Sequence, residues 1–229
     1  MPKIRNFRKF EKQIGFEFKN NDLLRQVFVH RSYLNEHPDF ELHSNERLEF
    51  LGDAVIELIT TEYLFENFPN AEGDLTNWRA SLVNGVMLSE LSKKLKMGDC
   101  LFLSKGEERT GEKSRQLILA NCFEALVGAI YLDGGYESAK NFIKKTLLKK
   151  LPTILKNKLY IEPKSRLQEI IQESEGITPI YKVIKESGPD HAKEFIVGVY
   201  INDKLLAKGK GSSKQNAEQA AAAKALKKT

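Results

Sequence analysis

The sequence has little cysteine, and it lacks both a long apolar run and an apolar segment near its first residue. Only Cys100 and Cys122 occur in 229 residues, and their spacing fits no metal-binding motif, so a disulfide framework or a zinc site is not expected. No stretch approaches the roughly 18 apolar residues of a membrane span. Residues 1–10 have no apolar block of the kind that a secretory signal needs. We therefore expect a protein of the reducing cytoplasm with no membrane partner.

Basic residues outnumber acidic ones in the last third of the chain. Residues 158–229 hold 13 Lys and Arg against 9 Asp and Glu, whereas residues 1–157 hold 23 against 22. The net charges are therefore +4 and +1, so the basic excess lies mostly in the shorter segment. Such an imbalance favours a polyanionic partner for that segment.

Three acids interrupt an apolar helical pattern in the first half of the chain. Residues 44–68 repeat apolar side chains at helical spacing, and Glu46, Glu49 and Asp53 fall within roughly 60° of one another on that helix. Acids on one stripe repel each other, and a divalent cation with oxygen ligands relieves such repulsion. The alternative is a solvated acidic face with Arg47 as a partial partner.

A second apolar helix also carries oxygen ligands. Residues 114–132 are apolar enough to be buried on all sides, yet they contain Asn121 and Glu124 at i, i+3, and Gly134-Gly135 is expected to end the helix. Two buried helices that face one another can build a hard-cation site between them. The two acidic helices therefore favour a metal site over a solvated face.

The rest of residues 1–157 predicts helices and no strand. We expect helices over residues 21–30, 74–95 and 136–155, with residues 72–74 supplying turn and N-cap chemistry before the second. Residues 105–114 are charged and glycine-flanked, so we expect a mobile surface loop there. Residues 156–162 are the expected linker. The prediction is an all-α domain over residues 1–157.

The pattern changes after Pro163, which is expected to open a helix through residue 174. Alternating or β-branched segments predict strands over residues 180–184, 194–201 and 204–209, separated by turn residues. An alanine-rich helix is expected over residues 213–228. Residues 158–229 therefore predict a small α+β domain of order α-β-β-β-α.

These motifs together resemble a known family. The segment NERLEFLGD at residues 45–53 resembles the signature of the ribonuclease III family, and Glu72-Gly73-Asp74 and ILANCFEAL at residues 118–126 follow in the family's order. The α-β-β-β-α segment resembles the double-stranded RNA-binding domain, so the resemblance covers nearly the whole chain. It implies an endoribonuclease that hydrolyses double-stranded RNA with Mg²⁺, or Mn²⁺ in its place, and needs no small-molecule cofactor. It also implies 5′-phosphate and 3′-hydroxyl ends with short 3′ overhangs, and a role in ribosomal RNA and other RNA processing.

The resemblance also assigns roles to the acidic residues. It implies that Glu49, Asn121 and Glu124 are metal ligands and that Asp53 acts with Glu124 in catalysis. Glu46 and Glu72 are expected nearby. Asn121 stands where some members have Asp, which removes a charge but keeps an oxygen ligand. The family acts as a homodimer, and Phe50 is implied to contact the partner; ordinary core packing is the alternative.

A second set of residues is implied to hold the RNA. Gly209 and Gly211 allow a close ligand approach, and Ser212 or Ser213 can cap the last helix, whose amides attract phosphate. The alternative for the glycine loop is a tight turn into a capped helix. For Gln168 and Gln172 the alternative is a polar helix surface, and for His191 it is an exposed loop residue. The residues implied to contact duplex RNA are Ser165, Gln168, Glu169, Gln172, His191, Lys210, Ser212 and Lys214.

Two other functions remain open at this point. The chain could be a double-stranded RNA-binding protein that has lost catalysis, although all its acidic positions are present. It could also be a metal-dependent enzyme on small phosphorylated substrates, but this reading leaves the RNA-binding domain without a role. His30, His37 and His43 show no ligand spacing and receive no role.

Overall fold

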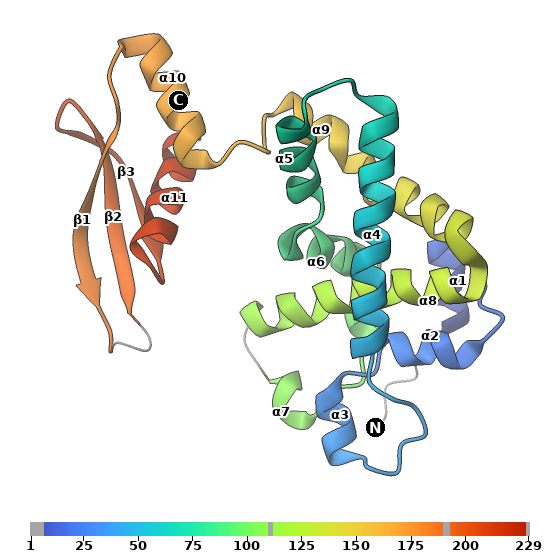
Figure 1. Ribbon diagram of the computed structural model, residues 1–229. Coiled ribbons are helices and arrows are strands. Elements are labelled where there is room, and N and C mark those ends of the chain that lie inside the picture. Colours follow the sequence, from blue (N-terminus) through green and yellow to red (C-terminus); the bar gives the residue numbers. More distant parts are fainter. Residues whose placement is uncertain (1–6, 110–111, 190–192, 228–229) are drawn as a thin grey trace. The chain divides into compact units, whose positions relative to one another are not determined.

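A computed structural model describes residues 7–109, 112–189 and 193–227. The chain divides into two compact units, Met1–Asn157 and Lys158–Thr229 (Figure 1). The first unit is helical, and the second is a three-stranded sheet with two helices. The two units correspond to the change of pattern before Pro163 in the sequence.

The described part of the first unit is built from α-helices and short 3₁₀ turns, with a single isolated bridge between Val29 and Phe102. Its elements are α1 (Phe7–Ile14), α2 (Asn21–Val27), α3 (Arg31–Glu36), α4 (Glu46–Asn67), α5 (Glu72–Leu82), α6 (Gly85–Lys94), η1 (Met97–Asp99), α7 (Lys105–Glu108), α8 (Glu112–Thr146), η2 (Leu148–Lys150) and α9 (Leu151–Lys156).

The centre of this unit is the crossing of α4 and α8 (Figure 1). Two glycines allow the helix backbones to touch: a Cβ on Gly52 would lie 1.8 Å from the Glu124 carbonyl oxygen, and one on Gly128 would lie 2.3 Å from that of Leu48. The buried side chains on either side of the crossing include Leu48, Val55, Ile56, Ile59, Phe123, Leu126 and Ile130. Both acidic helices therefore meet at a fixed and close distance.

Three sequence expectations for this unit were wrong in detail. The helix expected over residues 74–95 is two helices, because Asn84 accepts a hydrogen bond from the Met87 amide (3.0 Å) and starts α6 there. Residues 72–74 lie inside α5 rather than before it. The segment expected as a loop over 105–114 contains α7, capped by Ser104, and the start of α8.

Helix α8 is interrupted at Gly135, within the glycine pair that was expected to end the helix. Gly135 has φ 76° and ψ −178°, a conformation that glycine adopts without strain. The expected helix over residues 136–155 is the last part of α8 followed by η2 and α9. In the described residues, Arg115–Lys156 is long and apolar enough by composition to cross a membrane, but 61% of its most apolar window is buried inside the protein. A buried core helix can have the same length and apolar composition.

The second unit has the predicted α-β-β-β-α order. Its elements are α10 (Pro163–Glu175), β1 (Ile180–Ser187), β2 (Glu194–Ile201), β3 (Lys204–Gly211) and α11 (Lys214–Ala225), and the antiparallel sheet has the order β1-β2-β3. Leu167 and Ile171 of α10 pack with Val199 of β2 and with the alanines of α11. One face of the sheet is thereby covered by both helices.

Candidate active site and RNA-binding surface

The start of α4 is hydrogen-bonded to the end of α2 and to the segment that follows it. Asn45 is buried, its side-chain amide donates to the Val27 carbonyl (2.9 Å), and its backbone N–H donates to the Val29 carbonyl (2.8 Å). Glu46 then begins the helix, where negative charge is favoured by the helix dipole, and it accepts from the Ser44 hydroxyl (2.9 Å). These contacts fix the position from which the acidic side chains of α4 project.

Glu49, Asn121 and Glu124 converge at the crossing of α4 and α8. The Asn121 side chain lies close enough to the Glu49 carboxylate to lower its pKa. Burial has the larger effect and raises the pKa of Glu49, and the charges of Glu46 and Asp53 raise it further. Burial also raises the pKa of Glu124 to about 7, with the charges of Asp53 and Glu49 adding to the effect. The structure thus brings together the residues from both acidic helices.

The donors of this cluster fit a hard divalent cation. Two partly buried carboxylates with raised pKa values are relieved by a positive charge, and the Asn121 amide can turn its oxygen toward it. Among the described residues no group of three His, Cys, Asp or Glu side chains is arranged to hold a metal ion, and the third oxygen donor that this cluster offers is the Asn121 amide. Asp53 lies exposed at the edge of the cluster. A solvated acidic face would leave these carboxyl pKa values unshifted.

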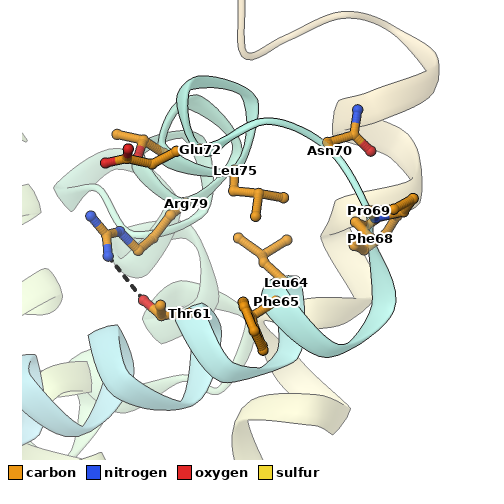
Figure 2. Close-up of a pocket in the computed structure, with 10 residues that line it drawn as sticks. Thr61, Leu64, Phe65, Phe68, Pro69, Asn70, Glu72, Leu75 and Arg79 are labelled. Carbon is orange, nitrogen blue, oxygen red and sulfur yellow. Dashed lines mark hydrogen bonds between the residues drawn. The ribbon is translucent and has the colours of Figure 1, made fainter.

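Glu72 does not lie with these residues in the same protomer. It lines a hollow of about 610 Å³ formed by the end of α4 and by α5, together with Thr61, Phe65 and Arg79 (Figure 2). The Arg79 guanidinium donates to the Thr61 hydroxyl there (2.9 Å). Because α4 rises about 1.5 Å per residue, Thr61 lies roughly 18 Å along the helix from Glu49. The expectation that Glu72 is near the other acids is therefore wrong within one protomer.

Phe50 lies on the opposite side of α4 from α8 and is 83% exposed, so the alternative of core packing is wrong. Leu58 and Phe65 are 59% and 79% exposed and fall with Phe50 within roughly 80° of the helix circumference. We call Phe50, Leu58 and Phe65 the α4 apolar stripe. An exposed apolar stripe of this kind marks an interaction surface.

The residues expected to contact RNA are exposed where the structure describes them. Ser165, Gln168, Glu169 and Gln172 recur at i, i+3, i+4 and i+7 of α10 and form one exposed face. The Gln172 side chain accepts from the Thr178 hydroxyl (3.3 Å). His191 lies outside the described residues.

The turn into α11 carries the rest of this surface. Lys210, Ser212 and Lys214 are exposed, although Lys210 pairs with Glu194 (2.6 Å). Ser213 rather than Ser212 caps α11, because its hydroxyl accepts from the Asn216 amide (3.1 Å). Phosphate can approach the remaining free amides of this helix start.

The two glycines before α11 have a different role from the expected one. A Cβ on Gly209 would lie 2.1 Å from the Ala221 nitrogen, and one on Gly211 would lie 2.5 Å from the Ala217 nitrogen. They therefore allow β3 to pass against the α11 backbone, and the expectation that they accommodate a ligand was wrong in this respect.

Sequence reasoning missed Asn45, Gly52 and Gly128 as residues that build the site. The available signals were a glycine in each of two apolar helices, which points to close backbone packing, and an asparagine just before a helix start. None of the three contacts the cluster through a charged group, so no charge pattern marked them.

Comparison with known proteins gives a consistent result. A family model described as Ribonuclease-III-like matches residues 20–151, and a double-stranded RNA binding motif matches residues 163–229. The Ribonuclease 3 of Nitratiruptor sp. is 42% identical over 98% of this chain and 97% of its own length. That of Carboxydothermus hydrogenoformans is 45% identical over 96% and 94%.

Solved structures are similar as well. Two structures of the nuclease domain of ribonuclease III from Campylobacter jejuni have TM-scores of 0.58, at 40% and 39% identity. They cover 64% and 65% of this chain and 99% and 98% of their own, and one is described as flexible in a region involved in dimer formation. The chain therefore belongs to the ribonuclease III family of double-stranded RNA endoribonucleases.

Proposed function

We propose that this enzyme hydrolyses double-stranded RNA in a Mg²⁺-dependent reaction, with Mn²⁺ able to substitute and no small-molecule cofactor. The observation that carries the proposal is the convergence of Glu49, Asn121 and Glu124. Burial and neighbouring acids raise the carboxyl pKa values of Glu49 and Glu124. Hard oxygen donors of this kind suit Mg²⁺ better than softer metals. Glu46 lies beside the cluster, where Arg31 partly offsets its charge (3.5 Å).

The chain's own residues position the reacting groups. When bound, the cation lowers the pKa of an attacking water and offsets charge on the scissile phosphate. Glu49, Asn121 and Glu124 would hold it, and Glu124 would bind it as the carboxylate. Asp53 is exposed beside Glu124, so it can reach the RNA and act with Glu124 in catalysis. The products are a 5′-phosphate and a 3′-hydroxyl.

The enzyme acts as a homodimer that packs through the α4 apolar stripe. The exposure of Phe50, Leu58 and Phe65 supports this proposal, because together they offer a surface that water solvates poorly. In a two-fold packing of antiparallel α4 helices, the start of one helix faces the end of the other. Such a packing brings Phe50 toward the partner's hollow of Figure 2, and it brings Glu72 toward the partner's acidic residues.

Two sites related by a two-fold axis match the symmetry of an RNA duplex, so both strands are cut and short 3′ overhangs result. The second unit holds the duplex by shape, through minor-groove contacts from α10 and phosphate contacts near Lys210 and Lys214. The cellular role that fits this activity is processing of ribosomal RNA and other RNAs, including messenger RNA, in the cytoplasm.

The test is incubation of the protein with a perfect RNA duplex, with and without Mg²⁺, followed by analysis of the product ends. Cleavage only with Mg²⁺, leaving 5′-phosphates, is expected. A duplex that stays intact in Mg²⁺ while its gel mobility still shifts would favour the alternative of a binding protein without catalysis. Hydrolysis of small phosphorylated substrates with no attack on the duplex would favour the third alternative.

A further inference from the structure

Positive charge is segregated within the helical unit. Residues 136–157 contain six Lys and one Glu, whereas residues 1–135 contain 17 Lys and Arg against 21 Asp and Glu. The net charges are therefore +5 and −4. A helical surface usually mixes both signs, so a block of one sign is typical of a surface that meets a partner of the opposite sign.

Part of this block surrounds a hollow of about 550 Å³ between α4, the end of α8 and η2. Its lining includes Tyr63, Asn141 and three exposed lysines, Lys144, Lys145 and Lys149, and none of its described lining residues is acidic. The ion pairs found in the described part of the chain do not involve these three lysines. We call Lys144, Lys145 and Lys149 the lysine cluster.

Two other lysines of this segment, Lys140 and Lys150, have surroundings that differ from those of the lysine cluster. The Lys140 ammonium lies 2.7 Å from the Glu62 carboxylate, which also accepts from the Tyr136 hydroxyl, so this lysine is neutralised within the fold. The pKa of Lys150 is lowered, mainly by the nearby Lys94 and also by burial, while the charge of Glu90 offsets part of the effect.

A membrane surface does not explain this block. A helix that lies on a membrane presents large apolar side chains beside its lysines. Most large apolar side chains of residues 136–157 are buried, namely Phe142, Ile143, Leu147, Leu148, Leu151 and Ile154, and Leu155 is half-buried. Around the lysine cluster the hollow offers Asn141 and Tyr63, which suit a polar, phosphate-bearing ligand.

We propose that the lysine cluster binds backbone phosphates of RNA at a site separate from the RNA-binding unit. The inference rests on the proposed function, because the ligand is a flanking part of the same RNA. Tyr63 is 14 residues beyond Glu49 on α4, which places the hollow roughly 21 Å along that helix from the acidic cluster. A duplex engaged at the acidic cluster therefore has phosphates within reach of a second contact.

The test compares the full-length protein with a variant in which Lys144, Lys145 and Lys149 are each replaced by Gln. A matched control replaces the exposed Lys12, Lys19 and Lys105 by Gln, which removes the same charge elsewhere in the same unit. Binding of a perfect duplex about twice the roughly 16 bp span of one RNA-binding module is measured in EDTA across a salt series. Measurement without metal separates this proposal from the proposed catalysis.

Loss of three phosphate contacts reduces the slope of log affinity against log salt by roughly 2 to 3. From about 50 to 200 mM salt, the unaltered protein should therefore lose roughly 20- to 40-fold more affinity than the lysine-cluster variant. The control should follow the unaltered protein, and Arg at the same three positions should restore its slope. In Mg²⁺ the Gln variant should show a raised KM with little change in kcat.

Three results would overturn the proposal. The Gln variant could keep the unaltered slope, or the control could lose as much slope as the variant, which would indicate a general charge effect. The variant could also keep its RNA affinity but lose binding to vesicles of anionic lipid, which would make the surface a membrane contact. If the unaltered protein binds with the expected slopes but never cleaves RNA, the proposed function fails while this site stands.

Discussion

Replacing Glu124 by Gln should stabilise the metal-free protein at alkaline pH although it removes a metal ligand. The Glu124 carboxyl has a pKa of about 7 in the folded protein against 4.5 as its ordinary value, because it is partly buried beside Asp53 and Glu49. The folded state therefore holds this proton more tightly than the unfolded state does. Its free energy of unfolding falls as pH rises from about 4.5 to about 7, and the full penalty is present above that window.

The size of the effect follows from the two pKa values. A rise from 4.5 to about 7 corresponds to roughly 3 kcal/mol, and residual exposure of the side chain to water reduces this to about 2 kcal/mol. For a domain of this size, each kcal/mol moves the melting temperature by roughly 2–4 °C. The neutral amide of Gln removes the penalty, so Glu124→Gln should melt about 4–8 °C above the unaltered protein at pH 8.5.

The assay is thermal unfolding in EDTA at pH 8.5 and at pH 4.5, with Glu137→Gln as the control because Glu137 is an exposed carboxylate of the same helix. The difference should nearly disappear at pH 4.5, and the control should show none at either pH. Saturating Mg²⁺ should stabilise the unaltered protein and leave Glu124→Gln unchanged. Equal melting temperatures of Glu124→Gln and the unaltered protein at pH 8.5 in EDTA would refute the claim that the ionised Glu124 carboxyl destabilises the metal-free protein.

Four further outcomes are expected. Asn121→Asp should keep activity and lower the Mg²⁺ concentration that half-saturates cleavage, measured by a Mg²⁺ titration; loss of cleavage would show that an amide donor is needed. Deleting residues 158–229 should weaken cleavage at about 200 mM salt and spare it at about 50 mM, measured as initial rates; full-length rates at high salt would contradict this. Gly52→Ala should cost about 3 kcal/mol or more in chemical unfolding, since its Cβ would meet the Glu124 carbonyl at 1.8 Å; a cost below 1 kcal/mol would refute the tight crossing. Phe50→Asp should yield monomers by light scattering, whereas Leu132→Asp on α8 should stay dimeric; a dimeric Phe50→Asp would exclude the α4 apolar stripe as the interface.

Much of the fold could be predicted because periodicity and breakers agree along the chain. The helix predicted over residues 44–68 is α4 within two residues at its start, and the α-β-β-β-α order of the second unit is confirmed. The missed break between α5 and α6 depends on one side-chain bond from Asn84, which leaves the apolar spacing intact. Local capping of this kind has no signal in the hydrophobic pattern.

The acidic cluster could be predicted only in part. Helical spacing places Glu46, Glu49 and Asp53 on one stripe, but the approach of Glu124 depends on two glycines that lie 76 residues apart. Glu72 follows α4 closely in the sequence, yet the length of that helix carries it away from Glu49 within one protomer. Sequence proximity of motifs therefore does not give their proximity in space.

The most direct test of the central claim is to compare Glu124→Ala with the unaltered protein in two measurements on one RNA duplex. The first is the cleavage rate with Mg²⁺, and the second is the dissociation constant in EDTA. We predict that Glu124→Ala loses cleavage while its dissociation constant stays within about 2-fold, because the RNA-binding unit is unchanged and one phosphate contact or fewer is affected. Cleavage by Glu124→Ala at the unaltered rate would contradict the assignment of Glu49, Asn121 and Glu124 as the catalytic metal site.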